Sequence, residues 1–299
     1  MKALPEVSVV VLTFNSENFI SECLRSLSNQ SYPSIKIFVV DNNSQDNTLA
    51  ILDNFKNIEI TKNSQNIGVC SARNIIIKKI TSKYVLTMDS DVVLDENFVS
   101  SIVSSAENSS PDIGMWGGTV LSIKDHKTID TLGLKLGRFY RFYDLGSGKN
   151  RNYIFKNSND AVGPCACSAL YSKRMLESIN SRGEFFDSEM HYLVEDFDLA
   201  LRARSKGWRF QYVAEALCYH YRHGSNIKRD YVKYLSFKNR YLLILKDFKF
   251  PKTPYLILSL ISYDIPRLIY LLIVNYAYTK KAILEISKII WRRKILKKQ

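Results

Sequence analysis

Two aspartates separated by a single serine stand at the end of an apolar segment. Residues 85–88 (VLTM) have the composition of a buried strand, and Asp89, Ser90 and Asp91 follow them directly. An unpaired carboxylate near the interior costs on the order of several kcal/mol, so we expect a cation to balance the pair. Mg²⁺ and Mn²⁺ prefer oxygen ligands and typically bind one or two carboxylates together with substrate phosphates. The pattern therefore predicts a metal–diphosphate site, with an ordinary Asp-Ser-Asp surface turn as the alternative.

A second pair of acids opens the segment EDFDLALRARSK. Glu195 and Asp196 begin a predicted helix over residues 195–206. Neighbouring helical residues point about 100° apart, so only one of the two carboxylates is expected to face a substrate. Asp198 and Arg202 have the spacing of an i,i+4 ion pair, which assigns Asp198 a structural role.

The elements that position these acids alternate between strands and helices. Apolar strands are predicted at 7–12, 35–40, 58–61 and 84–88, and helices at 18–30, 48–55 and 68–80. Strands that are apolar on both faces indicate a parallel α/β sheet covered by helices on both sides. Ligands bind at the carboxyl ends of the strands in such sheets. The polar ends at residues 13–15, 41–43 and 89–91 are therefore expected to open onto one crevice.

The alternation weakens beyond residue 95. Residues 119–153 are rich in Gly, Lys, Arg and Tyr and are predicted to be partly irregular. The small residues of 161–171 favour a strand that passes close to a ligand. A further strand at 210–218 leads to His220 and His223.

The net charge of +13 is concentrated at the C-terminal end of the 299 residues. Residues 228–299 contain 17 Lys and Arg against 4 Asp and Glu, which leaves 25 basic and 25 acidic groups in residues 1–227. A neutral body argues against a nucleic-acid-binding protein. A basic tail is typical of a segment that meets an anionic surface.

The tail is also apolar, and it is interrupted. Residues 255–278 contain Asp264, Pro266, Arg267 and Asn275, so neither half reaches the roughly 20 apolar residues of a spanning helix. Residues 282–295 place isoleucines on one side and basic residues elsewhere. We interpret 228–299 as helices that lie in a membrane interface. The alternatives are a helical subdomain packed on the body, or a dimer contact.

The cysteines and the N-terminus indicate the compartment. The five cysteines are scattered and contain no CxxC pair, which is typical of reduced thiols in the cytoplasm. A zinc site of Cys165, Cys167, Cys218 and His220 is an alternative with poor ligand spacing. The first residues lack the apolar core of a signal peptide. We expect a cytoplasmic protein, peripheral on the inner face of the cell membrane.

The order of the motifs resembles family 2 of the glycosyltransferases. VVLTFN, VVDNNSQDNT, NIGVCSARN, TMDSDV and EDFDLALRARSKGW follow one another within residues 7–225. The series is specific as an ordered set. The resemblance implies the GT-A fold and a metal-dependent, inverting sugar transferase that faces the cytoplasm.

The resemblance also implies roles for individual residues. The nucleotide-binding positions are Thr13, Asn15, Asp41, Asn66, Gly68, Arg73, Asp89, Ser90 and Asp91, with Asp41 accepting a base N–H. Asp89 and Asp91 match the ligands of Mg²⁺ or Mn²⁺, which His220 assists in some members. Glu195 and Asp196 are the catalytic acids, with Asp196 as general base, and Asp187 matches an acceptor-side acid. The alternatives are a turn cap for Asp41, a solvated charge for Arg73 and an ordinary histidine for His220.

The predicted function is transfer of a sugar from a nucleotide-diphosphate donor to a hydroxyl of a lipid-linked or glycan acceptor. Such acceptors belong to surface-polysaccharide or glycoprotein assembly. A sugar-nucleotide nucleotidyltransferase is a second possibility, but it requires a Gly-rich phosphate loop that TFNSEN lacks. A non-catalytic nucleotide-sugar binding module is a third, and it would not need the carboxylates of EDFDL.

Overall fold

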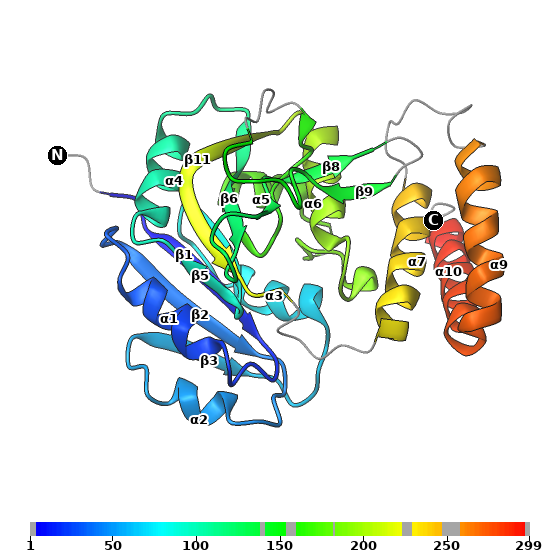
Figure 1. Cartoon of the computed structure of the whole chain (residues 1–299), viewed down its shortest axis with the longest axis horizontal. Helices are drawn as coiled ribbons and strands as arrows, with labels where there is room; N and C mark the ends of the chain where they lie inside the picture. Colours follow the sequence, from blue (N-terminus) through cyan, green and yellow to red (C-terminus); the bar gives the residue numbers. More distant parts are fainter. Residues whose placement is uncertain are drawn as a thin grey trace.

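A nine-stranded sheet organises the chain in this computed structural model (Figure 1). The structure describes residues 4–137, 141–153, 160–181, 183–222, 229–246 and 258–296. His223, the second candidate histidine, lies outside these ranges, as does the start of the apolar run at 255–278.

The first half of the sheet is parallel, as the apolar strands predict. Its strands are β1 (Val7–Thr13), β2 (Ile35–Asp41), β3 (Ile58–Lys62) and β4 (Tyr84–Asp89), in the order β3-β2-β1-β4. The helices between them are α1 (Ile20–Ser28), α2 (Thr48–Leu52) and α3 (Val69–Ile77). Each lies within or close to the range expected from the sequence. This half confirms the prediction of an α/β sheet.

The second half of the sheet is mixed. β10 (Ser168–Ser172) runs antiparallel between β4 and β6 (Ile113–Ser122), and β11 (Arg209–His220) runs parallel to β6. The shorter strands are β5 (Val92–Leu94), β7 (Ile129–Thr131), and the separate pair β8 (Leu134–Leu136) and β9 (Phe142–Asp144).

The strand expected at 161–171 is regular only from Ser168. Pro164 has no N–H to donate to a ladder, so the preceding residues leave the sheet as an irregular segment. Residues 119–153, expected to be partly irregular, contain the end of β6 and the three short strands β7, β8 and β9.

β11 contains a bulge that changes its register against β6. Tyr212 pairs with Gly117 and Leu217 pairs with Thr119. Residues 213–216 of β11 therefore lie opposite Gly118 alone. A Cβ at Gly118 would lie 1.9 Å from the carbonyl oxygen of Ala216, so only glycine fits beside the bulge. After the bulge, β11 also pairs with β5 and ends at His220.

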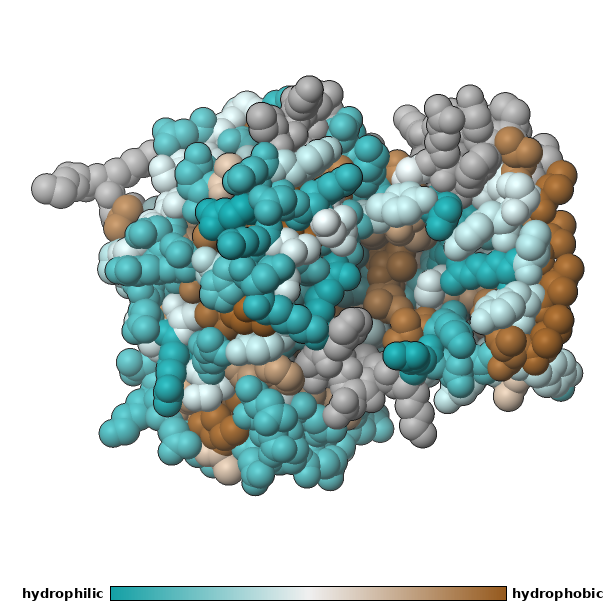
Figure 2. All heavy atoms as spheres, viewed as in Figure 1, coloured by the Kyte–Doolittle hydropathy of each residue, from teal (hydrophilic) through white to brown (hydrophobic). Residues whose placement is uncertain are grey.

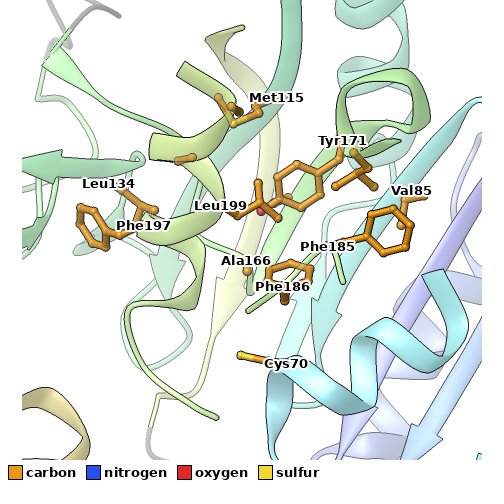
Figure 3. Packing of buried hydrophobic residues seen from close by; sticks show 14 of the residues in the cluster. Cys70, Val85, Met115, Leu134, Ala166, Tyr171, Phe185, Phe186, Phe197 and Leu199 are labelled. Carbon is orange, nitrogen blue, oxygen red and sulfur yellow. The ribbon is translucent and has the colours of Figure 1, made fainter. Parts of the chain in front are cut away.

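Helices cover both faces of the sheet, as expected. α1, α2 and α4 (Phe98–Glu107) pack on one face, and α3, α5 (Lys173–Ile179) and α6 (Glu195–Ser205) pack on the other. Figure 3 shows the second core, to which α6 contributes Phe197 and Leu199, α3 contributes Cys70 and β10 contributes Tyr171. This core holds α6, and with it the acids at its N-terminus.

The C-terminal region is helical and packs on the body through its first helix. Its elements are α7 (Arg229–Leu245), the π-helical turn η4 (Leu260–Asp264), α9 (Ile265–Val274) and α10 (Tyr276–Leu296). Tyr234 and Phe237 of α7 pack with Leu271 of α9 and Ala282 of α10. The domain boundary predicted after residue 227 stays a prediction. α7, the first helix beyond that boundary, contacts the body directly.

The outer faces of the last helices are exposed and apolar. Of the sixteen large exposed hydrophobic residues in the described ranges, twelve lie between Leu258 and Trp291. Figure 2 shows a band of strongly apolar residues along the edge formed by α9. Among the described helices, none is both long enough and apolar enough to cross a membrane.

Candidate active site

The carboxyl ends of β1, β2 and β4 meet at one edge of the sheet. Thr13 is paired with Asp41, and Leu12 is paired with Asp89. A cavity of about 980 Å³ opens at this edge. The predicted site residues that line it are Asn15, Asn66, Gly68, Arg73, Asp89, Ser90, Asp91, Glu195, Asp196 and His220. The expected crevice is therefore present, and most of the predicted residues share it.

Asp91 contacts His220, which in turn contacts Asp130. The Nε2 atom of His220 lies 3.3 Å from Asp91 Oδ1, and Nδ1 lies 2.8 Å from Asp130 Oδ2. Burial alone would lower the pKa of His220, but its hydrogen bonds to Asp130 and Asp91 raise it to about 10. His220 is thus an oriented partner of Asp91 at the cavity wall.

Asp130 on β7 was missed by sequence reasoning. It also forms an ion pair with Arg222, which pairs with Asp144 at 2.8 Å. Asp130 belongs to the segment 119–153, which shows no interpretable period. Asp130 reaches His220 because β7 pairs with β6, and the local sequence of 119–153 does not predict that pairing.

Arg73 joins the two acidic motifs. Its guanidinium donates to Asp89 Oδ1 at 2.5 Å and to Glu195 Oε1 at 3.2 Å. The side chain is 1% exposed, so the alternative of a solvated charge is wrong. Burial raises the pKa of Asp89 and of Glu195, and Arg73 offsets part of that effect. The predicted contact of Arg73 with a nucleotide stays a prediction.

Asp196 has a different environment from Glu195. It accepts hydrogen bonds from the backbone N–H of Phe197 at 2.8 Å and of Ala166 at 3.4 Å. Burial, together with the charges of Glu195 and Asp144, raises the pKa of Asp196 to about 8. Glu195 is engaged by Arg73, whereas no basic side chain in the described ranges forms an ion pair with Asp196. A carboxyl with these properties suits general-base chemistry near neutral pH.

The loop before α6 has an unusual backbone. His191, Leu193 and Val194 have φ values of 63°, 67° and 69°, which cost free energy for residues other than glycine. Asn239 on α7 holds this loop: its side-chain amide donates to the carbonyls of Met190, Tyr192 and Leu193 at 2.7–2.8 Å. Sequence reasoning missed Asn239 because it lies in the predicted tail.

Three predicted residues lie outside the cavity lining. Asp41 is buried and accepts both the N–H and the hydroxyl of Ser44, at 3.0 and 2.5 Å, which is the geometry of the turn-cap alternative. Thr13 is 1% exposed, and its Oγ1 has no hydrogen-bond partner among the described residues. Asp187 accepts the N–H of Glu189 and pairs at 2.6 Å with Lys246, the residue that follows α7.

The remaining residues predicted to bind the donor hold the backbone or one another in place. Gly68 has a φ of 83°, and a Cβ there would lie 2.3 Å from Nδ1 of His191, so glycine is required. Asn66 accepts hydrogen bonds from Asn42 at 2.9 Å and from the N–H of Gly68 at 3.0 Å. Asn15 accepts the N–H of Gln45 at 2.7 Å, and Ser90 shares a 2.7 Å hydrogen bond with Ser16.

The acids fit a cation that a substrate helps to bind. No group of three or more His, Cys, Asp or Glu in the described ranges is arranged to hold a metal ion by itself. Asp91 and Asp89 both line the cavity and can supply oxygen ligands, and His220 can add its Nε2 nitrogen once a cation displaces the proton shared with Asp91. Mg²⁺ and Mn²⁺ complete their coordination with phosphate oxygens, so a partial site of this kind suits them.

The zinc alternative fails on the same observation. Cys165, Cys167, Cys218 and His220 do not form a metal-holding group in the described ranges. Burial raises the pKa of the Cys218 thiol, which donates instead to Ser168 Oγ at 3.3 Å.

Comparison with known proteins identifies relatives. An uncharacterized glycosyltransferase of Haemophilus influenzae is 31% identical over 137 residues, which are 44% of this chain and 42% of that protein. The poly(ribitol-phosphate) beta-N-acetylglucosaminyltransferase TarS of Staphylococcus aureus is 32% identical over 112 residues, 36% of this chain and 20% of that protein. The matches thus span less than half of these relatives' length.

Solved structures show the same fold. A crystal structure of S. aureus TarS residues 1–349 with UDP superposes with a TM-score of 0.54 at 19% identity, over 82% of this chain and 67% of that one. A mannosyltransferase from Pyrobaculum calidifontis with GDP-Man and Mn²⁺ gives 0.58 at 14% identity, over 99% and 81%. The sequence profile of glycosyl transferase family 2 matches residues 8–179, more than half of the chain. The chain therefore belongs to glycosyl transferase family 2, with the mixed α/β architecture of GT-A glycosyltransferases.

Proposed function

We propose that this chain transfers a sugar from a nucleoside-diphosphate donor to an acceptor hydroxyl, with inversion at the anomeric carbon. The observation that carries the proposal is the separation of roles between two adjacent acids. Glu195 is bound by Arg73, whereas Asp196 faces the same cavity with its pKa raised to about 8. One acid supports the site, and the other is available to accept a proton.

The reaction is a single displacement. The acceptor oxygen forms a bond to the anomeric carbon while the bond from that carbon to the diphosphate oxygen breaks, and the electron pair leaves with the diphosphate. Asp196 takes the proton of the acceptor hydroxyl. Attack from the face opposite the leaving group inverts the configuration, and the sugar passes through an oxocarbenium-like state.

Asp91, Asp89 and His220 are the residues that would hold Mg²⁺ or Mn²⁺. The bound cation would neutralise the charge that develops on the leaving diphosphate. Asp130 orients His220, and Arg73 fixes Asp89, so the chain keeps these side chains in place through paired charges. Asn15, Asn66, Gly68 and Ser90 line the part of the cavity assigned to the donor.

The same proposal includes attachment to the inner face of the cell membrane. The exposed apolar side chains of η4, α9 and α10 support it, together with the exposed Lys280, Lys281 and Arg292. Apolar contact and attraction to anionic head groups act together in such surfaces. The acceptor would then be a lipid-linked or membrane-bound glycan.

The test is a panel of nucleotide sugars with Mg²⁺ or Mn²⁺, in which the release of nucleoside diphosphate is followed. Asp196→Asn should lower turnover by roughly 10²–10⁴ and leave nucleotide affinity nearly intact. Glu177→Gln, at an exposed acid of α5, is the matched control and should behave as the wild type. Full activity of Asp196→Asn together with an inactive Glu195→Gln would reassign the base.

A further inference from the structure

Part of the cavity lining is basic and aromatic. Arg141 before β9, Arg240 of α7, Tyr263 of η4 and Arg267 of α9 all belong to it. Asp89, Asp91, Glu195 and Asp196 line the same cavity. One cavity therefore presents both acidic and basic side chains, and the two kinds suit different ligands.

Three guanidinium groups gather around the ring of Tyr263. Arg141, Arg240 and Arg267 place their central carbons 5.0, 5.2 and 5.6 Å from the ring centroid. A guanidinium over the face of an aromatic ring is attracted by the negative charge of that face. The ring therefore supports like charges that would otherwise repel one another.

One of these three charges is balanced by a carboxylate. Arg240 binds Asp264 with two hydrogen bonds of 2.8 and 3.0 Å. Within the described ranges, neither Arg141 nor Arg267 has a carboxylate within 4.0 Å, and Arg267 donates to the hydroxyl of Ser236 at 3.0 Å. Among the described residues, two positively charged side chains of the cavity lining therefore have no carboxylate partner.

We propose that Arg141 and Arg267 bind a phosphate group carried by the acceptor. The inference rests on the proposed function, because a donor diphosphate is assigned to Asp89 and Asp91 through its cation. A guanidinium binds phosphate with two parallel hydrogen bonds, and two such groups suit a doubly charged ligand. An uncharged glycan would leave both charges uncompensated.

The source of the phosphate is either a polyprenyl phosphate lipid or a polyol phosphate. The chemistry recognised by the arginines is common to both. Tyr263 and Arg267 belong to η4 and α9, which also carry exposed apolar side chains that would favour binding of the lipid. A polyol phosphate would be bound by the guanidinium groups alone.

The experiment measures binding of phosphate probes to the full chain by calorimetry. The probes are glycerol 3-phosphate and farnesyl phosphate, with glycerol and farnesol as uncharged counterparts, first without nucleotide and then with UDP or GDP and Mn²⁺ present. We expect at least one phosphate probe to bind and its uncharged counterpart to bind at least tenfold more weakly. The affinity of that probe should fall at least tenfold in Arg141→Gln and in Arg267→Gln.

Arg174→Gln is the matched control, since Arg174 also stacks on an aromatic ring, 5.2 Å from the centroid of Trp208, but does not line the cavity. Preference for glycerol 3-phosphate identifies a polyol phosphate, and preference for farnesyl phosphate identifies a lipid. Equal affinity of both probes for the wild type and the two cavity variants would overturn the phosphate site. Failure of the wild type to bind any nucleotide would instead refute the proposed donor site, while the titration without nucleotide still decides the phosphate site.

Discussion

Asn239 of α7 donates a 2.7 Å hydrogen bond from its side-chain amide to the backbone carbonyl of Leu193, two residues before Glu195. The first helix of the C-terminal region thus holds the loop that precedes Glu195 and Asp196, the acids of the proposed mechanism. Lys238, its neighbour, donates to the carbonyl of Glu189 at 2.9 Å and strengthens the same connection.

Replacement of Asn239 should disturb turnover more than donor binding. Asn239→Ala leaves buried carbonyls without a donor, which lowers the free energy of unfolding by about 1–3 kcal/mol. Turnover of the fully folded protein should also fall, because the positive-φ residues at 191–194 are no longer held, whereas UDP or GDP affinity should change little. Lys233→Ala, at a position of α7 where the side chain is 41% exposed, is the control. A loss of turnover no larger than the loss of folded protein would contradict a positioning role.

The raised pKa of Asp196 predicts the pH dependence of turnover. The ionised form is the base, so the rate should rise with pH and level off above about pH 8. Asp196→Asn should remove this limb from the profile of its residual rate. A wild-type rate that is already constant from pH 6 to 9 would show that the base is another group, or that it ionises at lower pH in the complex.

The same pKa predicts a change in stability with pH. Because folding raises the pKa of Asp196 from 3.8 to about 8, the folded state binds this proton more tightly than the unfolded state does. The carboxyl therefore lowers the free energy of unfolding progressively from about pH 4 to pH 8. Asp196→Asn removes that loss, so the variant should be more stable than the wild type at pH 8 and equal to it near pH 4. Denaturant titrations at the two pH values measure the difference.

Asp130 should matter for metal affinity although it is absent from the family motifs quoted above. Asp130→Asn weakens the hold on Nδ1 of His220, which lies 2.8 Å away. Loss of such an outer partner typically costs 10–100-fold in metal affinity. Titration of Mn²⁺ in the presence of UDP or GDP measures the effect. Asp125→Asn on the exposed turn before β7 is the control, and equal weakening in both variants would remove the special role of Asp130.

The exposed face of α9 should bind anionic vesicles. The full chain is expected to float with vesicles that contain phosphatidylglycerol at low salt and to be released only in part at high salt, since apolar contact persists when charges are screened. Ile269→Ser with Ile273→Ser, at side chains 54% and 78% exposed, should allow complete release at high salt. Tyr153→Ser, exposed on the body, is the control. Sedimentation of the full chain away from vesicles at both salt concentrations would indicate a packing or oligomer surface instead.

The parallel half of the fold and its acidic tips are predictable from the sequence because the information is local. Uninterrupted apolar strands such as 7–12 and 84–88 specify a covered parallel sheet, and the registers Thr13–Asp41 and Leu12–Asp89 then bring their polar ends together. The pair Asp198–Arg202, formed at 2.8 Å, follows from helical spacing in the same way.

The rest of the site depends on contacts between distant segments. Asp130 reaches His220 across 90 residues, and Asn239 reaches Leu193 from a helix whose composition resembles the tail. Arg141 lies just before β9 and Arg267 lies in α9, so their common contact with Tyr263 joins segments that are far apart in the sequence. Asp41 shows the converse: the sequence places it at a strand tip, but both of its carboxylate oxygens accept from Ser44 and it is not among the residues that line the cavity.

The bulge of β11 has a consequence for how this chain tolerates changes of length. Side chains alternate between the two faces of a strand, so removing or adding one residue between Val213 and Ala216 would exchange the positions of His220 and its neighbours. Tyr219 or Tyr221 would then face Asp91. Gly118 packs tightly against Ala216, so the bulge cannot rearrange to restore the original register. Insertions and deletions acquired during evolution should therefore spare these four residues while accumulating in surface turns such as 123–127.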